Sequence, residues 1–224
     1  MTIYQDLTFP SAPQDRPYTF INMVSTIDGK TVSGDRNDNV VDLGSKVDHE
    51  LMDRIESASQ AILIGAQTLR STSPRWNPKA PVRIAVTKSG DVPFDAAFFA
   101  APEAQPYIAC PQQSSCYPPE PIARIIAGKD AVDPRWLSNY LRNELGVESL
   151  HILGGSEINA LFLSHDLVDE LFLTLAPKIK LGRGLPTYAG GDPLPKEHLQ
   201  NYELVEHHAV QDEVFLRYRR RWSS

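Results

Sequence analysis

Short runs of consecutive apolar residues recur along the chain and predict the strands of a sheet. The run Ala61-Ile62-Leu63-Ile64-Gly65 contains no polar side chain, so it suits a strand that is covered on both faces, as in a parallel sheet. Similar runs predict further strands at residues 18–26, 82–87, 105–110, 148–153 and 168–176.

Segments with apolar residues at helical spacing separate several of these strands. Residues 45–59 predict a helix, and Ser45 with Asp48 resembles a capping box at its start. A second helix is predicted over residues 133–146, where an Asp-Pro pair supplies the cap and the first turn, and a third over 156–164. Strands that alternate with helices predict an α/β sheet with right-handed crossovers.

The end of the chain predicts an antiparallel edge on this mostly parallel sheet. Two strand-like segments, 202–210 and 213–219, are separated by two residues, which fits a closing hairpin. Residues 1–17 are polar and proline-rich and are interpreted as an N-terminal arm, so residues 18–224 would form a single domain. The proline-rich stretch 111–121 is interpreted as a long loop within that domain.

Composition and charge narrow the classes of function. The net charge of -6 and the pI of about 5.5 argue against a general nucleic-acid or membrane-surface binder, which needs a basic surface. No stretch approaches the roughly 20 apolar residues of a membrane span, and residues 1–10 lack the pattern of a signal peptide. Cys110 and Cys116 lack a CxxC spacing, and the histidines show no metal-ligand spacing. We therefore expect a cytoplasmic protein with no metal, nucleic-acid or membrane partner.

A glycine pair is the first candidate for chemistry. Gly154 and Gly155 stand between the strand predicted at 148–153 and the helix predicted at 156–164. Glycine permits close approach of the backbone to a ligand, and the N–H groups of a helix start favour a phosphate. A tight turn without any ligand remains the structural alternative for a lone glycine pair.

The ends of three other predicted strands carry glycine, hydroxyl or cationic groups in the same way. Such groups suit an anionic ligand: several phosphates, or one dinucleotide with a phosphorylated substrate. Each segment also has a structural alternative, namely a turn at Asp28-Gly29, a helix cap at Thr68, and a turn with a solvated lysine at Lys88. Asp169-Glu170 is interpreted as a solvated strand start. The segments are Thr26–Lys30, Gly65–Arg70 followed by Pro74-Arg75, and Thr87–Gly90.

Three segments together carry a family resemblance. They read NMVSTIDGKTV, AILIGAQTLRSTSPRW and LHILGGSEINALFLSHDLVDELFLTLAPKIKLGRGLP, and they resemble the signature blocks of the riboflavin-biosynthesis pyrimidine reductases. This family comprises the C-terminal reductase domain of bifunctional deaminase–reductases and its stand-alone counterparts, with a three-layer dihydrofolate-reductase-like fold. The zinc-deaminase motifs HxE and PCxxC are missing, so the resemblance is to the reductase domain alone.

The resemblance implies an NADPH-dependent reductase, similar to 5-amino-6-(5-phosphoribosylamino)uracil reductase, that converts the ribosyl group of a phosphorylated pyrimidine to ribityl. It also implies a homodimer. Asp28 and Lys30 are the implied catalytic positions, and the substrate-binding positions are Thr26, Asp28, Thr72, Arg75 and Leu153. The cofactor-binding positions are Gly65, Thr68, Thr87, Lys88, Ser89, Gly154, Gly155, Ser156 and Glu157. Lys88 and Ser89 fall where such reductases hold the adenosine 2′-phosphate, which favours NADPH over NADH.

The chain departs from the family pattern at positions on the substrate side. The family has Glu before the glycine pair, where this chain has Leu153, and Asp where this chain has Thr72; Thr26 replaces a serine. A site that loses hydrogen-bonding carboxylates changes its substrate preference. Two alternatives therefore stay open: a reductase of the same fold that acts on a pterin or another carbonyl or imine, and a non-catalytic dinucleotide-binding module.

Overall fold

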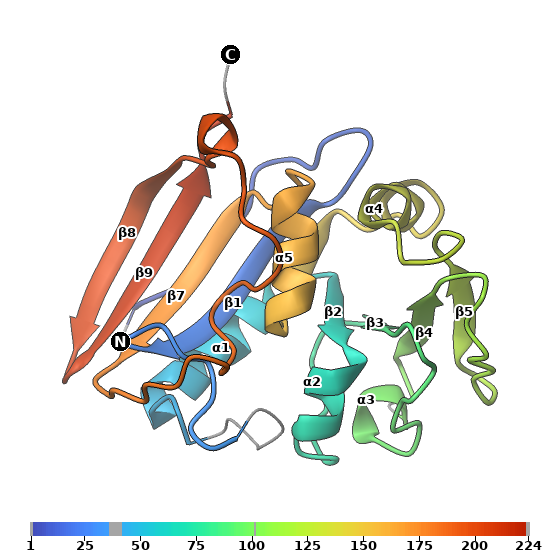
Figure 1. Ribbon diagram of the computed structural model, residues 1–224, viewed down its shortest axis with the longest axis horizontal. Helices are drawn as coiled ribbons and strands as arrows, with labels where there is room; N and C mark the ends of the chain where they lie inside the picture. Colours follow the sequence, from blue (N-terminus) through green and yellow to red (C-terminus); the bar gives the residue numbers. More distant parts are fainter. Residues whose placement is uncertain (1, 36–41, 101, 223–224) are drawn as a thin grey trace.

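The computed structural model describes residues 2–35, 42–100 and 102–222. Its described residues form one sheet in the order β5-β4-β3-β2-β6-β1-β7-β9-β8 (Figure 1). The pairs from β5 to β7 are parallel, and β9 pairs antiparallel with both β7 and β8. The strands are β1 (Tyr18–Thr26), β2 (Ala61–Gly65), β3 (Val82–Val86), β4 (Gln105–Cys110), β5 (Ala123–Ile126), β6 (Ser149–Ile152), β7 (Glu170–Ala176), β8 (Tyr202–Val210) and β9 (Glu213–Arg220).

The predicted α/β sheet and its closing hairpin are confirmed, and Gln211-Asp212 forms the connection between β8 and β9. The predicted helices are confirmed as α1, α4 and α5. Sequence reasoning missed strand β5, which has only four residues and follows the proline-rich stretch. The helices are α1 (Lys46–Ser57), α2 (Ala66–Ser71), α3 (Ala97–Ala100), α4 (Pro134–Asn143) and α5 (Ser156–Ser164), with a 3-10 turn η1 (Lys196–His198).

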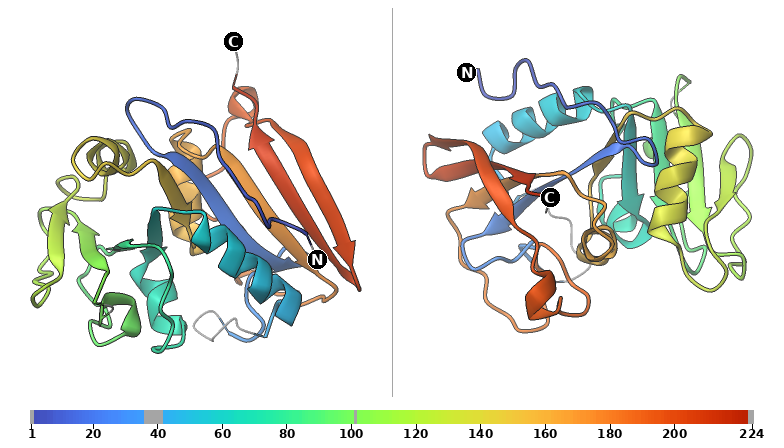
Figure 2. Two further views of the ribbon diagram at one scale, coloured as in Figure 1. Left: turned by 180° about the vertical axis from the view of Figure 1, so that it is seen from behind. Right: turned by 90° about the horizontal axis from the view of Figure 1, so that it is seen from above.

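Helices cover both faces of the sheet, which gives three layers (Figure 2). Alternation along β1 sends Phe20 to the α1 side, where it packs with Leu51 and Ile55, and sends Ile21 to the opposite side. There the core includes Leu137 of α4, together with Phe162 of α5. Among the described helices, none has the length and apolar composition to cross a membrane.

The N-terminal segment packs along the α1 side of the sheet. Phe9 stacks on Phe20 with ring centroids 4.2 Å apart, and Tyr4 meets Phe172 edge to face at 5.2 Å. Ile3 is buried as well. The division into an arm of residues 1–17 and a domain stays a prediction, but the described part of this segment contributes side chains to the core.

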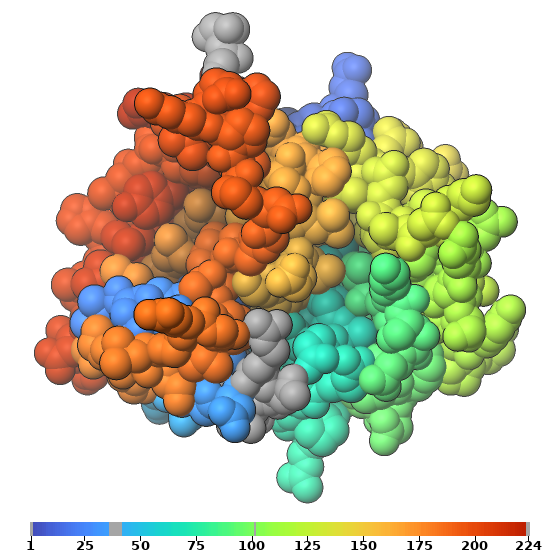
Figure 3. Space-filling model, viewed as in Figure 1, coloured from blue at the N-terminus to red at the C-terminus, as the bar shows by residue number. Residues whose placement is uncertain are grey.

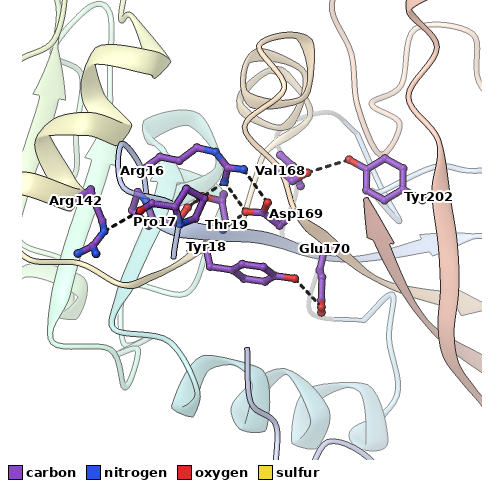
Figure 4. A network of polar contacts seen from close by, with 10 residues as sticks. Arg16, Pro17, Tyr18, Thr19, Arg142, Val168, Asp169, Glu170 and Tyr202 are labelled. Carbon is purple, nitrogen blue, oxygen red and sulfur yellow. Dashed lines mark hydrogen bonds and ion pairs between the residues drawn. The ribbon is translucent and has the colours of Figure 1, made fainter. Parts of the chain in front are cut away.

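The interpretation of Asp169-Glu170 as a solvated strand start is wrong. Both carboxylates are buried, with 3% and 0% exposure, because basic and hydroxyl groups from distant segments surround them (Figure 4). Arg16 donates to Asp169 at 2.8 Å. Glu170 accepts from Tyr18 at 2.8 Å and pairs with Arg217 and Arg219 at 2.7 and 2.8 Å. The network ties the N-terminal segment and β9 to the start of β7.

Candidate functional site

A cavity of about 1010 Å³ opens where β1, β2, β3 and β6 end. This is the edge where ligands bind in parallel sheets. Segment 177–190, in orange, crosses beside α5 on the face in Figure 3, and part of it lines the cavity. The residues that line it include Asn22, Met23, Val24, Val32, Asp48, Met52, Gly65, Thr68, Arg70, Thr72, Trp76, Thr87, Lys88, Ser89, Leu153, Gly155, Ser156, Glu157, Arg183–Thr187 and Gly190.

The glycine pair forms one wall of this cavity. Gly154 has φ 81°, which suits glycine, and its carbonyl accepts a hydrogen bond from the Gly65 N–H at 2.8 Å. The peptide bond between Gly154 and Gly155 is cis. A Cβ added to Gly155 would lie 2.6 Å from the hydroxyl of Thr68 in α2, so only glycine fits next to α2 at this position.

Helix α5 starts from this turn without a side-chain cap. Gly155 is its N-cap residue, and no side chain satisfies the first N–H groups. These N–H groups and the helix dipole favour an anion. Ser156 and Glu157 follow and also line the cavity. The glycine cradle and the uncapped helix start therefore fit the diphosphate of a dinucleotide.

A second wall follows β3. The Thr87 hydroxyl accepts a hydrogen bond from the Gly90 N–H at 3.0 Å, which shapes the turn that carries Lys88 and Ser89. Both of these side chains are exposed and line the cavity. In the described part of the chain, Lys88 has no ion-pair partner, whereas Arg70 is paired with Asp91 at 3.2 Å. Lys88 therefore offers a cation to an anionic ligand.

The third wall is the segment Arg183–Thr187, which the sequence reasoning did not assign to the site. Hydrogen bonds hold it in place: the Gly190 N–H donates to the Ser156 carbonyl at 3.1 Å, and the Thr31 N–H to the Pro186 carbonyl at 3.1 Å. The cluster of glycine and basic residues after strand β7, LGRG, was the available signal. Like the segments after the other strands, it combines glycine with a cationic residue.

Thr26, Asp28 and Lys30 are close together but are not among the described residues that line the cavity. The Asp28 carboxylate accepts hydrogen bonds from the Thr26 hydroxyl at 2.6 Å and from the N–H groups of Lys180 and Leu181 at 3.0 and 2.8 Å. The Thr26 hydroxyl first, and then these backbone groups, lower the pKa of Asp28 to about 2. This carboxylate joins the loop after β1 to Lys180 and Leu181, which precede the third wall in the chain.

The other predicted substrate positions divide between the cavity and the outer surface. Leu153 and Thr72 line the cavity, and the Thr72 hydroxyl donates to the Thr68 carbonyl at 2.8 Å. Arg75 is exposed and does not line the cavity, whereas the adjacent Trp76 does. The predicted cofactor positions, apart from Gly154, therefore share one cavity with two of the substrate positions.

Sequence reasoning missed Asp48 as a site residue because Asp48 was interpreted as half of a capping box. The Ser45 half is confirmed, since its hydroxyl accepts from the N–H groups of Val47 and Asp48. The Asp48 half is wrong: the Ser45 N–H donates instead to Glu213 of β9 at 2.9 Å. The Asp48 side chain is therefore free to line the cavity, where the residue is 8% exposed and burial raises its pKa.

No group of three potential metal ligands occurs among the residues that the structure describes. The cations that line the cavity are Arg70, Lys88 and Arg183, and its carboxylates in the described part of the chain are Asp48 and Glu157. The site therefore combines basic groups and a glycine cradle with one buried carboxyl group.

Comparison with known proteins gives consistent matches over nearly the whole chain. Residues 17–216 match the model of the RibD C-terminal domain. A protein of Aquifex aeolicus named 2,5-diamino-6-ribosylamino-4(3H)-pyrimidinone 5′-phosphate reductase is 28% identical over 207 residues, which cover 86% of this chain and 92% of that protein. A protein of the same name from Archaeoglobus fulgidus is 26% identical over 204 residues, covering 81% and 90%.

Solved structures show the same fold at lower identity. The Acinetobacter baumannii RibD structure has a TM-score of 0.75 and 16% identity; the match covers 93% of this chain and 59% of that chain. The riboflavin biosynthesis reductase Rib7 of Saccharomyces cerevisiae has a TM-score of 0.71 and 18% identity, with coverage of 93% and 92%. The predicted dihydrofolate-reductase-like fold is confirmed.

Proposed function

The chain belongs to the RibD C-terminal domain family, and we propose that it reduces the ribosylamino group of a pyrimidine 5′-phosphate to a ribitylamino group with NADPH. The observation that carries this proposal is the cavity at the strand ends, with its glycine cradle at Gly154-Gly155. Its volume of about 1010 Å³ lies at the upper end of the roughly 300–1,000 Å³ of small-molecule sites. Such a volume suits a dinucleotide together with part of a substrate.

The chain's own groups would hold the dinucleotide at two places. Gly155, Ser156 and Glu157 at the start of α5, with Gly65 and Thr68 opposite, would hold the diphosphate. Thr87, Lys88 and Ser89 would hold the 2′-phosphate, because a cation and hydroxyls suit a phosphate where a carboxylate would suit a free ribose hydroxyl. When bound, the nicotinamide supplies a hydride.

The substrate would occupy the part of the cavity near Leu153 and Thr72. Arg75 stays the predicted contact for the substrate phosphate, and Arg183 is a second candidate because it lines the cavity. Asp28 and Lys30, which do not line the cavity, would act indirectly by holding the loop after β1 in place next to the third wall. Single replacements of Arg75 and Arg183 by Gln distinguish the two phosphate contacts through the KM of the phosphorylated substrate.

The test is turnover by the purified protein with NADPH and either the 2,5-diamino-pyrimidinone or the 5-amino-uracil form of the ribosylamino 5′-phosphate. We expect loss of NADPH absorbance and a ribitylamino product that is two hydrogens heavier, identified by mass spectrometry. NADPH binding without oxidation by either form would contradict the proposal. It would leave a non-catalytic module or another substrate.

The low polarity of the cavity lining near the proposed substrate position favours a second candidate function. Leu153 and Met52 are apolar, and the Thr72 hydroxyl donates its hydrogen bond to the Thr68 carbonyl. A wall of this kind would also accept a less polar carbonyl or imine, such as a pterin. The same assay with a dihydropterin distinguishes the two candidates.

A homodimer would be formed through the outer strand β8. This strand lies at the edge of the sheet, and Leu204 and Val205 on it are 48% and 39% exposed. Apolar side chains on an unpaired edge favour association with a second copy. Light scattering coupled to size-exclusion chromatography measures the mass, and a Leu204→Lys variant would then be monomeric.

A further inference from the structure

The buried carboxyl group of Asp48 has no role in the proposal above. The reduction consumes one proton for each hydride. We infer that the Asp48 carboxylic acid supplies this proton and is the general acid of the site. The inference rests on the proposed function, because it assigns a residue to that same reaction.

Asp48 lies in the first turn of helix α1, three residues after the N-cap Ser45. A carboxylate three residues after an N-cap serine commonly turns back to bind the N–H of that serine. Here Glu213 accepts the Ser45 N–H at 2.9 Å and also binds the Ser45 hydroxyl. Helix α1 is therefore capped without the Asp48 side chain, which packs against Gly44 and Thr174 and lines the cavity.

Asp48 lines the cavity from the α1 side of the sheet, beside β1 and β7. Asp48 hydrogen-bonds with Thr174, which pairs in register with the cavity-lining Val24 of β1. Met52, also apolar and in the cavity lining, follows one turn later on α1. Lys88, which would hold a dinucleotide phosphate, follows β3, and two strands lie between β3 and β1 in the sheet. This placement of Asp48 favours contact with the substrate over contact with the phosphate at Lys88.

The other described carboxylates in or near the cavity are less suited to donate this proton. Glu157 is exposed and lies in the first turn of α5, beside the groups that would bind the diphosphate. Asp28 does not line the cavity, and its three hydrogen bonds keep its pKa at about 2, so it holds no proton to give near neutral pH. Among the described residues, Asp48 is the remaining carboxyl group that lines the cavity, and it is only 8% exposed.

The chemistry balances with a single proton. In the ribosylamino substrate the bond between C1′ and O4′ breaks, and its electron pair stays on O4′. C1′ receives a hydride, and O4′ receives the Asp48 proton and becomes the free hydroxyl of the ribityl chain. The resulting Asp48 carboxylate regains a proton from solvent before the next turnover.

The groups around Asp48 favour its protonated form on balance. Burial is the largest effect and raises the pKa of Asp48. The hydrogen bond with Thr174 of β7 lowers this pKa. The negative charge of Glu213 on β9 raises it, and the charge of His49 lowers it. Because the acid form is the active one, kcat/KM should fall as the pH rises above the pKa of Asp48. An amide at this position cannot give a proton, so its pH profile should be flat in that range.

The experiment compares wild type, Asp48→Asn and the control Glu50→Gln. Glu50 is on the same helix, but it pairs with Lys46 at the surface and its side chain is 55% exposed. Loss of a general acid costs about 10²–10⁴-fold in rate, so we expect D48N to lose at least ~100-fold in kcat and its pH dependence. The melting temperature and the Kd for NADPH should stay at the wild-type values, and E50Q should match wild type throughout.

A binding measurement gives a second readout without turnover. With NADP⁺ present, substrate binding is measured by calorimetry in buffers of different ionisation enthalpy, at a pH where kcat/KM of the wild type has already fallen and free Asp48 is deprotonated. The O4′ acceptor should stabilise protonated Asp48, so wild type should take up a proton on binding and D48N should not. The proton uptake is measured on the wild-type protein, so this readout does not depend on whether D48N folds.

The outcomes separate this inference from the proposed function. An active wild type with an unaltered D48N, or a D48N that loses rate but keeps the wild-type pH profile and proton uptake, would overturn the role of Asp48 alone. Absence of proton uptake by wild type would also overturn it. A wild type without turnover on either pyrimidine would overturn the proposed function and this role with it.

Discussion

Replacement of Gly155 by alanine tests the glycine cradle directly. The added Cβ would lie 2.6 Å from the Thr68 hydroxyl, well inside the roughly 3.5–4.0 Å at which non-bonded atoms attract. Because the Thr68 hydroxyl is on a short side chain, the turn or α2 must move. Overpacking of this kind costs about 1–3 kcal/mol, and for a chain of this length each kcal/mol lowers the melting temperature by roughly 2–4 °C.

The assay is a double-mutant cycle with Thr68→Ala, which removes the clashing oxygen. The next atom in line is the Thr68 Cβ at 4.0 Å, an ordinary contact, so the double variant should regain most of the stability that G155A loses. The control is Gly184→Ala, since, apart from its two chain neighbours, none of the described residues lies within 4 Å of a Cβ added there. Its stability should be unchanged.

The G155A variant also tests how the glycine cradle contributes to NADPH binding. A displaced turn moves the N–H groups at the start of α5, so G155A should bind NADPH at least ~10-fold more weakly, which corresponds to about 1.4 kcal/mol. Fluorescence titration of the nicotinamide measures this affinity. Unchanged stability and unchanged NADPH affinity in G155A would refute the reasoning that only glycine fits next to Thr68 of α2 at this position.

Three further predictions concern charge. Lys88→Ala should weaken NADPH binding about 10-fold and leave NADH binding unaltered, because only NADPH has the 2′-phosphate; titration with both dinucleotides measures this. Glu170→Ala should cost about 3–5 kcal/mol in chemical denaturation, because it leaves Arg217 and Arg219 without their buried partner, whereas Glu203→Gln at the surface should cost almost nothing. Burial raises the pKa of Glu56 from 4.5 to about 7. The folded state therefore holds this proton more tightly, so its contribution of ~3 kcal/mol is complete below pH 4.5 and is lost as the pH rises through about 7; Glu56→Gln should abolish this part of the pH dependence of unfolding.

Much of the fold could be predicted from local pattern. The apolar run of β2 and the Asp133-Pro134 helix start depend on neighbours in the sequence, and both are where they were predicted. The four-residue strand β5 was missed because its pairing with β4 depends on the sheet and not on its own short sequence. Gly154-Gly155 could be identified because a glycine pair between a strand and a helix is itself a local signal.

The residues that were misinterpreted depend on partners far along the chain. Asp169 and Glu170 look like solvated acids until Arg16, Arg217 and Arg219 surround them. Asp48 fits a capping box because the competing acceptor, Glu213, is 168 positions away from Ser45. Local sequence cannot show which of two carboxylates takes the Ser45 N–H.

The bond between Ser45 and Glu213 also has a consequence for the order in which the protein matures. Glu213 is the first residue of β9, the last strand, while the helix that it caps follows β1. During synthesis the N-terminal portion leaves the ribosome first, and α1 then lacks this acceptor. The cap of Ser45 by Glu213 can therefore form only after β9 has emerged, so the start of the helix that carries Asp48 is completed late in synthesis.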